Sequence, residues 1–306
     1  MKQWLLLEIA EKISKKNPLH AKKIKNTLKG YSEKDLEGIE YFLKKYMTYL
    51  TKINKDLEYG INCYLRMIAD LTYEQVRFME TGKYSCSSFE EARQKVYNNP
   101  QTMESYMNAL MLSQFLWQHH YRIFLFFLNS LPQYKDKIKR YLEVGAGHGL
   151  FISEAVRILE DDTYLGVVDI SPASIKMARE FIDNSRIHYT RQDIFNFDTE
   201  KKFDFISMGE VLEHVEEPVK LLLKVKNLLN DHGLCFITAP ANAPAIDHIF
   251  LFKNQDEIIS VISSAGMEII DKVCAYAEKP QQGQDISAQK IPMMFAAFIK
   301  KTGNRQ

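Results

Sequence analysis

The sequence contains little cysteine, no long apolar run and almost no net charge, and each absence excludes a class of protein. Its four cysteines stand far apart and form no C-x-x-C pair, which argues against a zinc knuckle or a disulfide framework. The longest apolar stretch, residues 123–128, is far shorter than the roughly 20 residues that span a bilayer. The apolar run that follows Trp4 is likewise too short for a signal-peptide core. We therefore expect a cytoplasmic protein with no membrane partner.

The composition that remains is that of an ordinary globular protein. Of the 306 residues, 46% are hydrophobic and 26% are charged, which excludes a disordered or low-complexity chain. The formal net charge is +1, so no overall field directs the chain to nucleic acid. The length allows one large domain or two of ordinary size.

Residues 1–130 have the pattern of helices throughout, because glycine is scarce and apolar residues recur three and four positions apart. Ser32, followed by acidic residues at positions 33 and 35, predicts the start of one helix. A longer, continuous helix is predicted over residues 100–128, with a proline in its first turn. Apolar side chains surround its axis on nearly all sides, so we expect it to be buried.

From residue 140 the pattern changes to short apolar strands that alternate with helical stretches. Such alternation predicts a doubly wound parallel sheet with helices on both faces. We therefore divide the chain into an all-helical domain over residues 1–135, which serves as a cap, a substrate domain or an oligomerisation domain, and an α/β domain over residues 136–306. The predicted strands cover residues 140–144, 163–168, 187–189, 203–207, 233–238, 267–275 and 292–300.

Charge divides at nearly the same place. Residues 1–140 carry 23 lysines and arginines against 15 acidic residues, and residues 12–29 hold seven lysines and no acid. A solvated helical surface explains such a run, and a basic arm for an acidic partner is the alternative.

The strongest local signal is the glycine-rich segment that follows the first predicted strand, Glu143-Val144-Gly145-Ala146-Gly147-His148-Gly149. Gly145 permits the positive φ of a tight turn, Gly147 lets a ligand approach the backbone, and Gly149 allows a helix to pack closely on the strand. Such turns lie at the carboxyl end of a parallel strand, where the ligands of doubly wound sheets bind. Turn glycines that hold no ligand are the alternative.

Carboxylates at the next two strand ends strengthen this interpretation. Asp169 ends the second strand, 24 residues beyond Gly145, where an acid can accept both hydroxyls of a ribose. The third strand ends near Asp193, where a carboxylate can accept a hydrogen bond from an adenine amino group while Ile194 covers the ring. Taken singly, Asp169 is explained as a helix N-cap and Asp193 as a turn residue. Together with the glycine segment they predict a site for an adenosine-containing cofactor.

Spacing and charge indicate which cofactor. A nicotinamide site requires G-x-G-x-x-G, whereas the spacing here is G-x-G-x-G. Glu143 lies two residues before the first glycine, where its carboxylate would repel a pyrophosphate. It suits a cofactor that has no phosphate and carries a cationic amino acid tail, and S-adenosyl-L-methionine meets both demands.

These motifs, together with the segments Phe203–Val215 and Gly233–Pro240, resemble class I S-adenosylmethionine-dependent methyltransferases over residues 138–300. The resemblance implies a Rossmann-like sheet of seven strands, six of them parallel, and S-adenosyl-L-homocysteine as a product. It places Glu143 and the glycine loop at the methionine moiety, Asp169 at the ribose, and Asp193 with Ile194 at the adenine. The cofactor-contacting residues that it implies are Glu143, Gly145, Ala146, Gly147, Asp169, Ile170, Asp193, Ile194, Met208 and Gly209.

Methyl transfer is an in-line displacement, so the acceptor and any base that takes its proton must lie beside the sulfonium. Glu210, Glu213 and His214 follow the fourth strand, and His248 follows the fifth. We interpret these four as catalytic candidates, with His214 as a base or a substrate contact, and a purely structural role is the alternative. The E-x-x-E-H segment also resembles the metal-binding segment of ubiquinone-pathway and small-RNA methyltransferases, with both glutamates on one helix face. A divalent metal is nevertheless the less favoured interpretation.

The predicted function is methylation of a nitrogen or oxygen atom of a small-molecule acceptor, in specialised metabolism. The helical half is expected to close the mouth of the site and exclude water. An RNA methyltransferase that grips phosphates with residues 12–29, and a non-catalytic cofactor-binding module, are the alternatives. Nucleic acid is the less favoured partner because no aromatic platforms accompany those lysines, and a homodimer is left open. The helical residues expected at the acceptor pocket are Tyr106, Trp117, His119, His120 and Tyr121.

Overall fold

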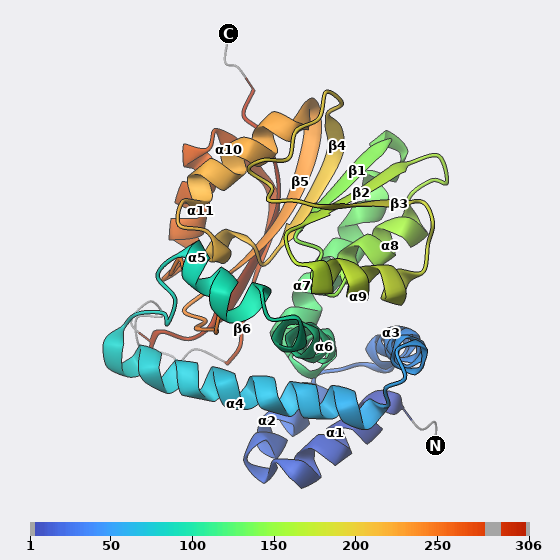
Figure 1. Cartoon of the computed structure of the whole chain (residues 1–306), viewed down its shortest axis with the longest axis vertical. Coiled ribbons are helices and arrows are strands. Elements are labelled where there is room, and N and C mark those ends of the chain that lie inside the picture. The colour runs from blue at the N-terminus through green and yellow to red at the C-terminus, as the bar shows by residue number, and fades with distance from the viewer. Residues whose placement is uncertain (1–3, 279–288, 304–306) are drawn as a thin grey trace.

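The computed structural model describes residues 4–278 and 289–303, and a seven-stranded sheet forms its centre (Figure 1). The strand order is β3-β2-β1-β4-β5-β7-β6, in which β7 runs antiparallel to both neighbours and the other six strands are parallel. The predicted Rossmann-like methyltransferase fold is therefore confirmed. The strands are β1 (Arg140–Val144), β2 (Tyr164–Asp169), β3 (Ile187–Arg191), β4 (Phe203–Gly209), β5 (Leu229–Ala241), β6 (Met267–Tyr276) and β7 (Met293–Lys301).

Helices cover both faces of this sheet (Figure 1). Two separate hydrophobic clusters form as a result, one on each face, and the larger includes side chains from the N-terminal helices. Prolines stand at the first turn of two covering helices, at Pro172 and Pro218, where a missing N–H costs nothing. One face carries α7 (Gln118–Ser130), α8 (Leu150–Ile158) and α9 (Pro172–Ile182); the other carries α10 (Pro218–Leu228) and α11 (Gln255–Ser264).

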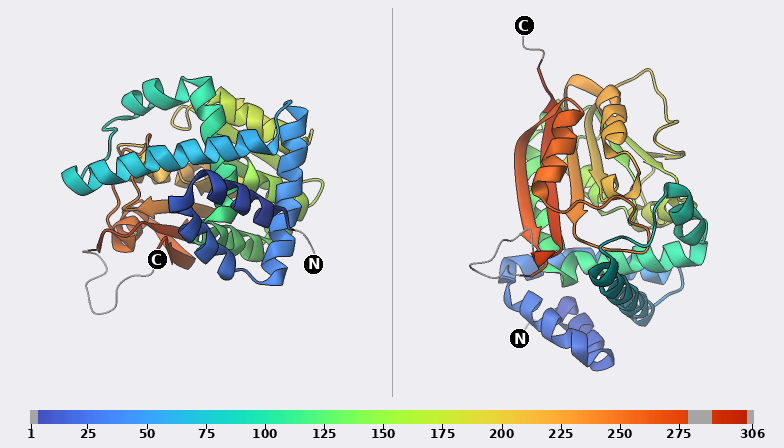
Figure 2. Two further views of the ribbon diagram at one scale, coloured as in Figure 1. Left: turned by 90° about the horizontal axis from the view of Figure 1, so that it is seen from below. Right: turned by 90° about the vertical axis from the view of Figure 1, so that its left-hand side faces the viewer.

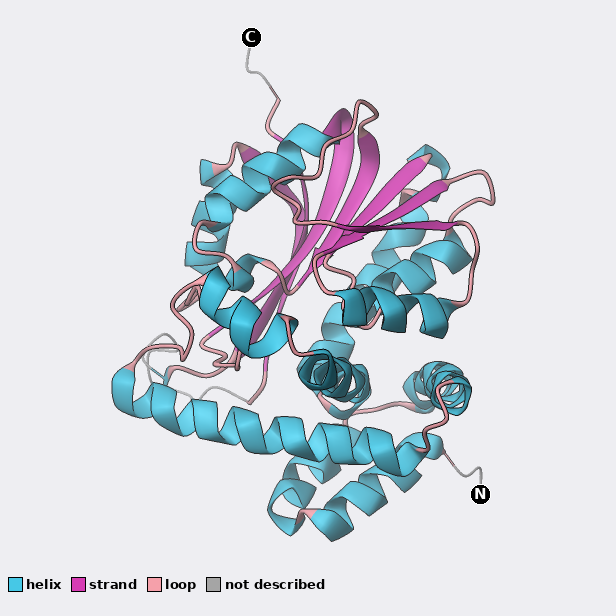
Figure 3. Ribbon diagram, viewed as in Figure 1, coloured by secondary structure: helices cyan, strands magenta, loops and turns pink. Residues whose placement is uncertain are grey.

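The remaining helices lie beyond the edge at which the parallel strands end (Figures 1 and 3). The longest of them crosses beneath that edge (Figure 2). Ser32 is the N-cap of the third helix of the chain, as the sequence predicts, and forms a capping box with Asp35. These helices are α1 (Leu5–Lys16), α2 (Pro18–Lys29), α3 (Glu33–Lys52), α4 (Leu57–Thr81), α5 (Phe89–Ala92), the π-helical turn η1 (Arg93–Tyr97) and α6 (Pro100–Leu116).

The two halves of the chain share apolar packing. The Tyr49 ring meets Phe181 of α9 with ring centroids 6.3 Å apart, and the Phe124 ring lies 6.0 Å from Phe151 of α8. The division of the chain at residue 135 stays a prediction. Among the described residues, no helix combines the length and the apolar character that crossing a membrane requires.

The prediction of one continuous helix over residues 100–128 was wrong. The helix breaks at Trp117, whose backbone is extended with φ −120° and ψ 117°, and α7 starts at the next residue. No proline or glycine signals this break. Tertiary contacts hold it instead, because the Trp117 indole N–H donates to the Tyr64 hydroxyl at 2.8 Å and its ring packs against His120 at 4.7 Å.

Two glycines with positive φ separate the effect of backbone strain from that of crowding. A side-chain carbon at Gly82 (φ 68°) would have no described atom within 4 Å, whereas one at Gly149 (φ 81°) would lie 2.9 Å from the Ala178 side chain. We expect Gly82→Ala to lower the free energy of unfolding by about 1 kcal/mol and Gly149→Ala by about 2–4 kcal/mol. Urea denaturation of both variants measures this, and equal losses would show that α8 and α9 are not closely packed at this point.

Candidate functional site

A cavity of about 360 Å³ lies between the carboxyl ends of the central strands and the N-terminal helices. The glycine loop after β1 and the residues that follow β2, β3 and β4 form one side of it. Helix α6 forms much of the other side, through Met103, Tyr106, Met107 and Leu110. The ends of the first four strands thus meet at one cavity, and α6 lies across it. That the helical half acts as a cap stays a prediction.

The glycine loop has the backbone conformation that its sequence predicts. Gly145, Gly147 and Gly149 all have positive φ, between 53° and 81°. Gly145, Ala146 and Gly147 line the cavity, so a ligand can approach the backbone there.

Asp169, at the end of β2, lines the same cavity. Its carboxylate accepts the backbone N–H of Ser171 at 2.7 Å and that of Gly147 at 3.3 Å, which joins the end of β2 to the glycine loop. Ser171, and not Asp169, is the N-cap of α9. Burial raises the pKa of Asp169 to about 6 despite these hydrogen bonds. Asp169 therefore does not cap α9, and its carboxylate connects the end of β2 to the glycine loop.

The residues after β3 contribute one acid and two apolar side chains to the cavity. Asp193 and Ile194 line the cavity as placed by the sequence, and Ile170 lies on the wall after β2. The Asp193 carboxylate accepts the backbone N–H of Phe195 at 2.9 Å. Sequence reasoning missed Phe195, whose ring also lines the cavity although 42% of the residue is exposed. Its position two residues after Asp193 was the signal that could have identified it.

Two predicted cofactor contacts lie outside the lining of the cavity. Glu143 is only 2% exposed, and its carboxylate accepts hydrogen bonds from Tyr141 at 3.3 Å and Ser207 at 3.4 Å. Burial raises its pKa well above the usual range. Met208 is fully buried in the hydrophobic cluster beneath α10, while the neighbouring Gly209 does line the cavity. Successive side chains of a strand lie on opposite faces of the sheet, and those of Glu143 and Met208 do not line the cavity.

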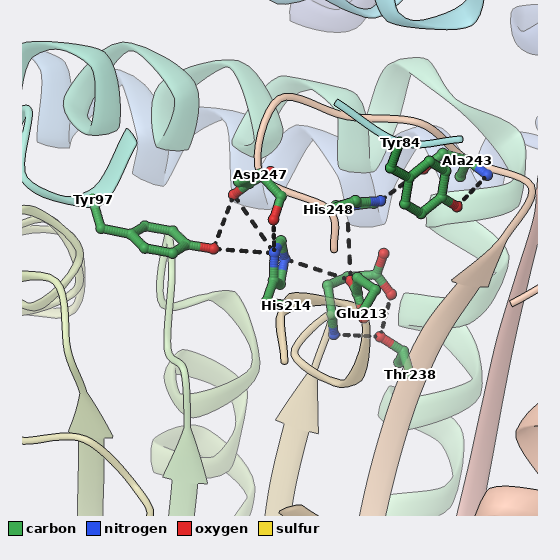
Figure 4. A network of polar contacts seen from close by, with 9 residues as sticks. Tyr84, Tyr97, Glu213, His214, Thr238, Ala243, Asp247 and His248 are labelled. Atoms are coloured by element: carbon green, nitrogen blue, oxygen red, sulfur yellow. Dashed lines mark hydrogen bonds and ion pairs between the residues drawn. The ribbon is translucent and has the colours of Figure 1, made fainter. Parts of the chain in front are cut away.

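Acids and histidines gather beyond the ends of β4 and β5 (Figure 4). Glu210 has a positive φ of 54° and is not in a helix, so the expected helix face shared by Glu210 and Glu213 does not form. Glu213 lies instead in the 3-10 turn η4 (Leu212–His214). The Thr238 hydroxyl accepts the Glu210 N–H at 2.9 Å and donates to its carboxylate at 2.6 Å. Burial raises the pKa of Glu210 to about 7.

Backbone carbonyls fix the protonation of both histidines. His214 Nδ1 lies 3.0 Å from the Asp247 carbonyl, and His248 Nδ1 lies 2.7 Å from the Ala243 carbonyl. A carbonyl only accepts, so each Nδ1 must carry a hydrogen and each neutral ring presents a lone pair at Nε2. Burial lowers the pKa of His248 to about 4, which keeps that ring neutral. Both Nε2 atoms face Glu213, at 3.6 Å from His214 and 3.9 Å from His248.

Glu213 is the centre of this cluster and has no hydrogen-bond donor for either side-chain oxygen among the described residues. It is fully buried, and burial together with the nearby Glu210 raises its pKa well above the usual range. Ligand atoms of Glu213, His214 and His248 lie within 4.8 Å of one another. A carboxylate and two lone pairs that face one another with no donor between them favour a cation, which is either a proton or a metal ion.

Tyr97 and Asp247 complete the cluster, and sequence reasoning did not select either. The Tyr97 hydroxyl lies 3.0 Å from His214 Nδ1 and donates to the Asp247 carboxylate at 3.2 Å. Tyr97 comes from η1, 117 residues before His214, and no local motif marks it. Of the five helical residues expected at the pocket, Tyr106 and His120 line the cavity, whereas Trp117, His119 and Tyr121 pack outside its lining.

Replacing Glu213 tests whether the cluster is a structural element. A carboxyl whose pKa is raised by folding favours the folded state at low pH, and that contribution is lost as the pH rises through the raised value. With a chelator present, we expect Glu213→Gln to stabilise the protein by about 1–3 kcal/mol at pH 8 and by less at pH 5. Thermal unfolding at both pH values measures this, with the exposed Glu200→Gln as control. A destabilised Glu213→Gln protein at pH 8 would assign the carboxylate a structural role.

Comparison with known proteins agrees with this architecture. Residues 116–291, more than half of the chain, match a family model described as a methyltransferase domain. The chain is 32% identical to the ubiquinone biosynthesis O-methyltransferase of Glaesserella parasuis over 132 residues, which cover 40% of this chain and 54% of that protein. It is 29% identical to the malonyl-[acyl-carrier protein] O-methyltransferase 1 of Ilyobacter polytropus over 93 residues, covering 30% and 34%. The chain thus matches about a third to a half of the length of these curated relatives.

Solved structures extend the likeness of the fold to the helical half. The mitomycin 7-O-methyltransferase MmcR superposes with a TM-score of 0.51 at 11% identity, over 76% of this chain and 68% of that one. A likeness at such low sequence identity shows only that the two folds are alike. From the matched model, the strand order and the glycine loop together, this chain belongs to the methyltransferase-domain family and has the class I S-adenosylmethionine-dependent methyltransferase fold.

Proposed function

We propose that this chain transfers a methyl group from S-adenosylmethionine to a nitrogen or oxygen atom of a small-molecule acceptor. The observation that carries the proposal is that a nucleoside-type site and an acid–histidine cluster line one cavity. Asp169 and Asp193 stand at the ends of β2 and β3, and Glu210 and His214 stand beyond β4. A binding module without activity would need only the first of these two groups of residues.

The cofactor-binding residues act by holding the nucleoside. Asp169 is positioned to accept the ribose hydroxyls, and its carboxylate is already oriented by two backbone N–H groups. Asp193, Ile194 and Phe195 offer an acceptor and apolar surface for an adenine ring. When bound, S-adenosylmethionine supplies the electrophilic methyl group and the thioether leaving group.

The acid–histidine cluster supports removal of a proton from the acceptor. His214 presents the lone pair of Nε2, because its Nδ1 hydrogen is directed at the Asp247 carbonyl. Glu213, with no donor of its own among the described residues, would stabilise the imidazolium that forms. Glu210 lines the cavity beside them as a second proton acceptor. In this proposal His248 keeps its Nε2 lone pair toward Glu213 and adds to the attraction for a positive charge.

A divalent metal ion fits the same donor set. Such an ion suits the two side-chain oxygens of Glu213, which have no donor among the described residues, and the Nε2 lone pairs of the two histidines. A bound ion would polarise an acceptor hydroxyl and assist its ionisation. The cluster can therefore assist the reaction by accepting a proton or by binding a metal ion. Treatment with a chelator distinguishes these two roles, because it removes only the metal ion.

The charge of the site disfavours an RNA acceptor. Lysine and arginine are absent from the described residues that line the cavity, which instead include Asp169, Asp193, Glu210 and Asp247. The lysine-rich segment lies in α1 and α2, and several of its lysines are already paired, as Lys15 is with Glu11 and Lys16 with Glu58. A phosphate backbone would find no cation among these lining residues. Failure to bind tRNA at low salt is the expected result.

A small acceptor agrees with the cavity volume of about 360 Å³ and with the ubiquinone biosynthesis O-methyltransferase among the relatives. Met103, Tyr106 and Leu110 of α6 would surround the apolar body of such a molecule. A role in specialised metabolism, a cytoplasmic location and a homodimeric state stay predictions.

Cofactor affinity should depend on the ionisation of Asp169. Ribose hydroxyls donate to the carboxylate, so protonation of a group whose pKa is about 6 competes with binding. We expect the dissociation constant of S-adenosylhomocysteine to rise about tenfold between pH 8 and pH 5, as measured by calorimetry. Asp169→Asn should bind more weakly at pH 8 and lose this pH dependence. An unchanged pH profile in that variant would assign the titration to another group.

His214 should affect turnover and not cofactor affinity. We expect His214→Ala to lower methyl transfer on the order of 10²–10⁴-fold, with the S-adenosylhomocysteine dissociation constant within twofold of the wild type. Turnover is measured as S-adenosylhomocysteine released with a panel of phenols and amines. Loss of wild-type turnover on dialysis against a chelator, restored by Mn²⁺, would assign the cluster to a metal. Unfolding of His214→Ala would support a structural role instead.

A further inference from the structure

Three polar side chains of the cavity have no role in the function proposed above. His148 belongs to the glycine loop, Gln114 to the last turn of α6, and His120 to the first turn of α7. None of the three lies in the acid–histidine cluster. Glu143, which the sequence assigns to the amino acid tail of the cofactor, does not line the cavity, so the charged groups of that tail need other partners.

His148 presents a hydrogen-bond donor. The backbone N–H of Leu150 donates to its Nδ1 at 3.2 Å, so Nδ1 holds the lone pair and the neutral ring carries its hydrogen on Nε2. Burial lowers the pKa of His148 to about 4, which keeps the ring neutral at pH 7. No other described residue hydrogen-bonds this ring, and its N–H remains available to a ligand.

His120 presents the complementary acceptor. Its Nδ1 lies 3.2 Å from the Ser113 hydroxyl, and that hydroxyl donates its single hydrogen to the Leu110 carbonyl at 2.8 Å. Ser113 must therefore accept from Nδ1–H, which leaves a lone pair at Nε2 of the neutral ring. Burial, together with the nearby His148, lowers the pKa of His120 to about 3. The His148 ring thus offers a neutral donor and the His120 ring a neutral acceptor, and both residues line the cavity.

The helix break at Trp117 brings the helical residues into this position. In a continuous helix, side chains six residues apart project in directions about 120° apart, so Gln114 and His120 would not share one face. Because α6 ends at Leu116 and α7 begins in a new direction at Gln118, the Gln114 and His120 side chains both line the cavity. Helix α6 also lies against the glycine loop, since the Met107 sulfur is 3.4 Å from where a side-chain carbon on Gly147 would be.

We propose that Gln114, His120 and His148 bind the amino acid tail of S-adenosylmethionine, so that the helical half completes the cofactor site. The His148 Nε2–H donates to the tail carboxylate, the His120 Nε2 accepts from the tail ammonium, and the Gln114 amide can do either. The tail has one charge of each sign, so a neutral donor–acceptor pair matches it without a buried counter-ion. This inference rests on the proposed function and adds residues to its cofactor site.

Two ligands that differ only in the tail test the proposal. S-adenosylhomocysteine carries the amino acid group, whereas 5′-deoxy-5′-methylthioadenosine has the same nucleoside and thioether and lacks it. By calorimetry at pH 7.5, we expect His120→Phe, His148→Phe and Gln114→Met each to weaken S-adenosylhomocysteine binding about tenfold or more. Methylthioadenosine binding should stay within twofold of the wild type.

A neighbouring histidine provides the matched control. His119 is also buried and next in sequence to His120, but it does not line the cavity, so His119→Phe should leave both affinities unchanged. Circular dichroism of every variant identifies any that fails to fold, and Gln114→Met, which loses no described hydrogen bond, serves where a histidine variant unfolds. Equal weakening of both ligands, or no weakening of either, overturns the inference. A wild-type chain that binds neither ligand overturns the proposed function instead.

Discussion

Desolvation of carboxylates at the ends of the parallel strands is the constraint on which the rest of the structure depends. Asp169 and Glu210 line a cavity that the N-terminal helices cover, Glu213 is buried close to it, and burial raises the pKa of all three. An ionised carboxylate without a partner is costly in such a place. Of the three, only Glu213 has no hydrogen-bond donor among the described residues, and such perturbed carboxylates are typical of sites for binding or chemistry.

The helical half creates this environment and also contributes to its polarity. Tyr97 reaches the acid–histidine cluster from a π-helical turn, and His120 reaches the glycine-loop side of the same cavity from α7. Both depend on irregular backbone: η1 for Tyr97 and the break at Trp117 for His120. A regular helix in either place would present different side chains to the cavity. Irregularities in helices often mark functional positions for this reason.

The fold was largely predictable from the sequence because its signals are local. Alternation of short apolar strands with helical stretches predicted the sheet, and Gly145, Asp169 and Asp193 marked the ends of its first three strands. The antiparallel direction of the last strand was predicted only from the resemblance to a family. Asp169 and Asp193 were found because each lies at or just after the end of a strand, and parallel strands place their ends at one edge. Glu143 was assigned to the cofactor from its charge and its place before the glycine loop, and Met208 from the resemblance to a family. Side chains alternate along β1 and β4, and neither of these two lines the cavity.

By itself, the sequence determined the sheet, the glycine loop and the carboxylates at its edge, because each depends on residues close together in the chain. Only the tertiary structure decided which histidine nitrogens carry hydrogens, since that depends on carbonyls such as those of Asp247 and Ala243, which lie on a loop of no fixed pattern. It also decided where α6 ends, because the Trp117 indole bonds to Tyr64 on another helix. Contacts between distant segments override local helix propensity, and no local pattern encodes them.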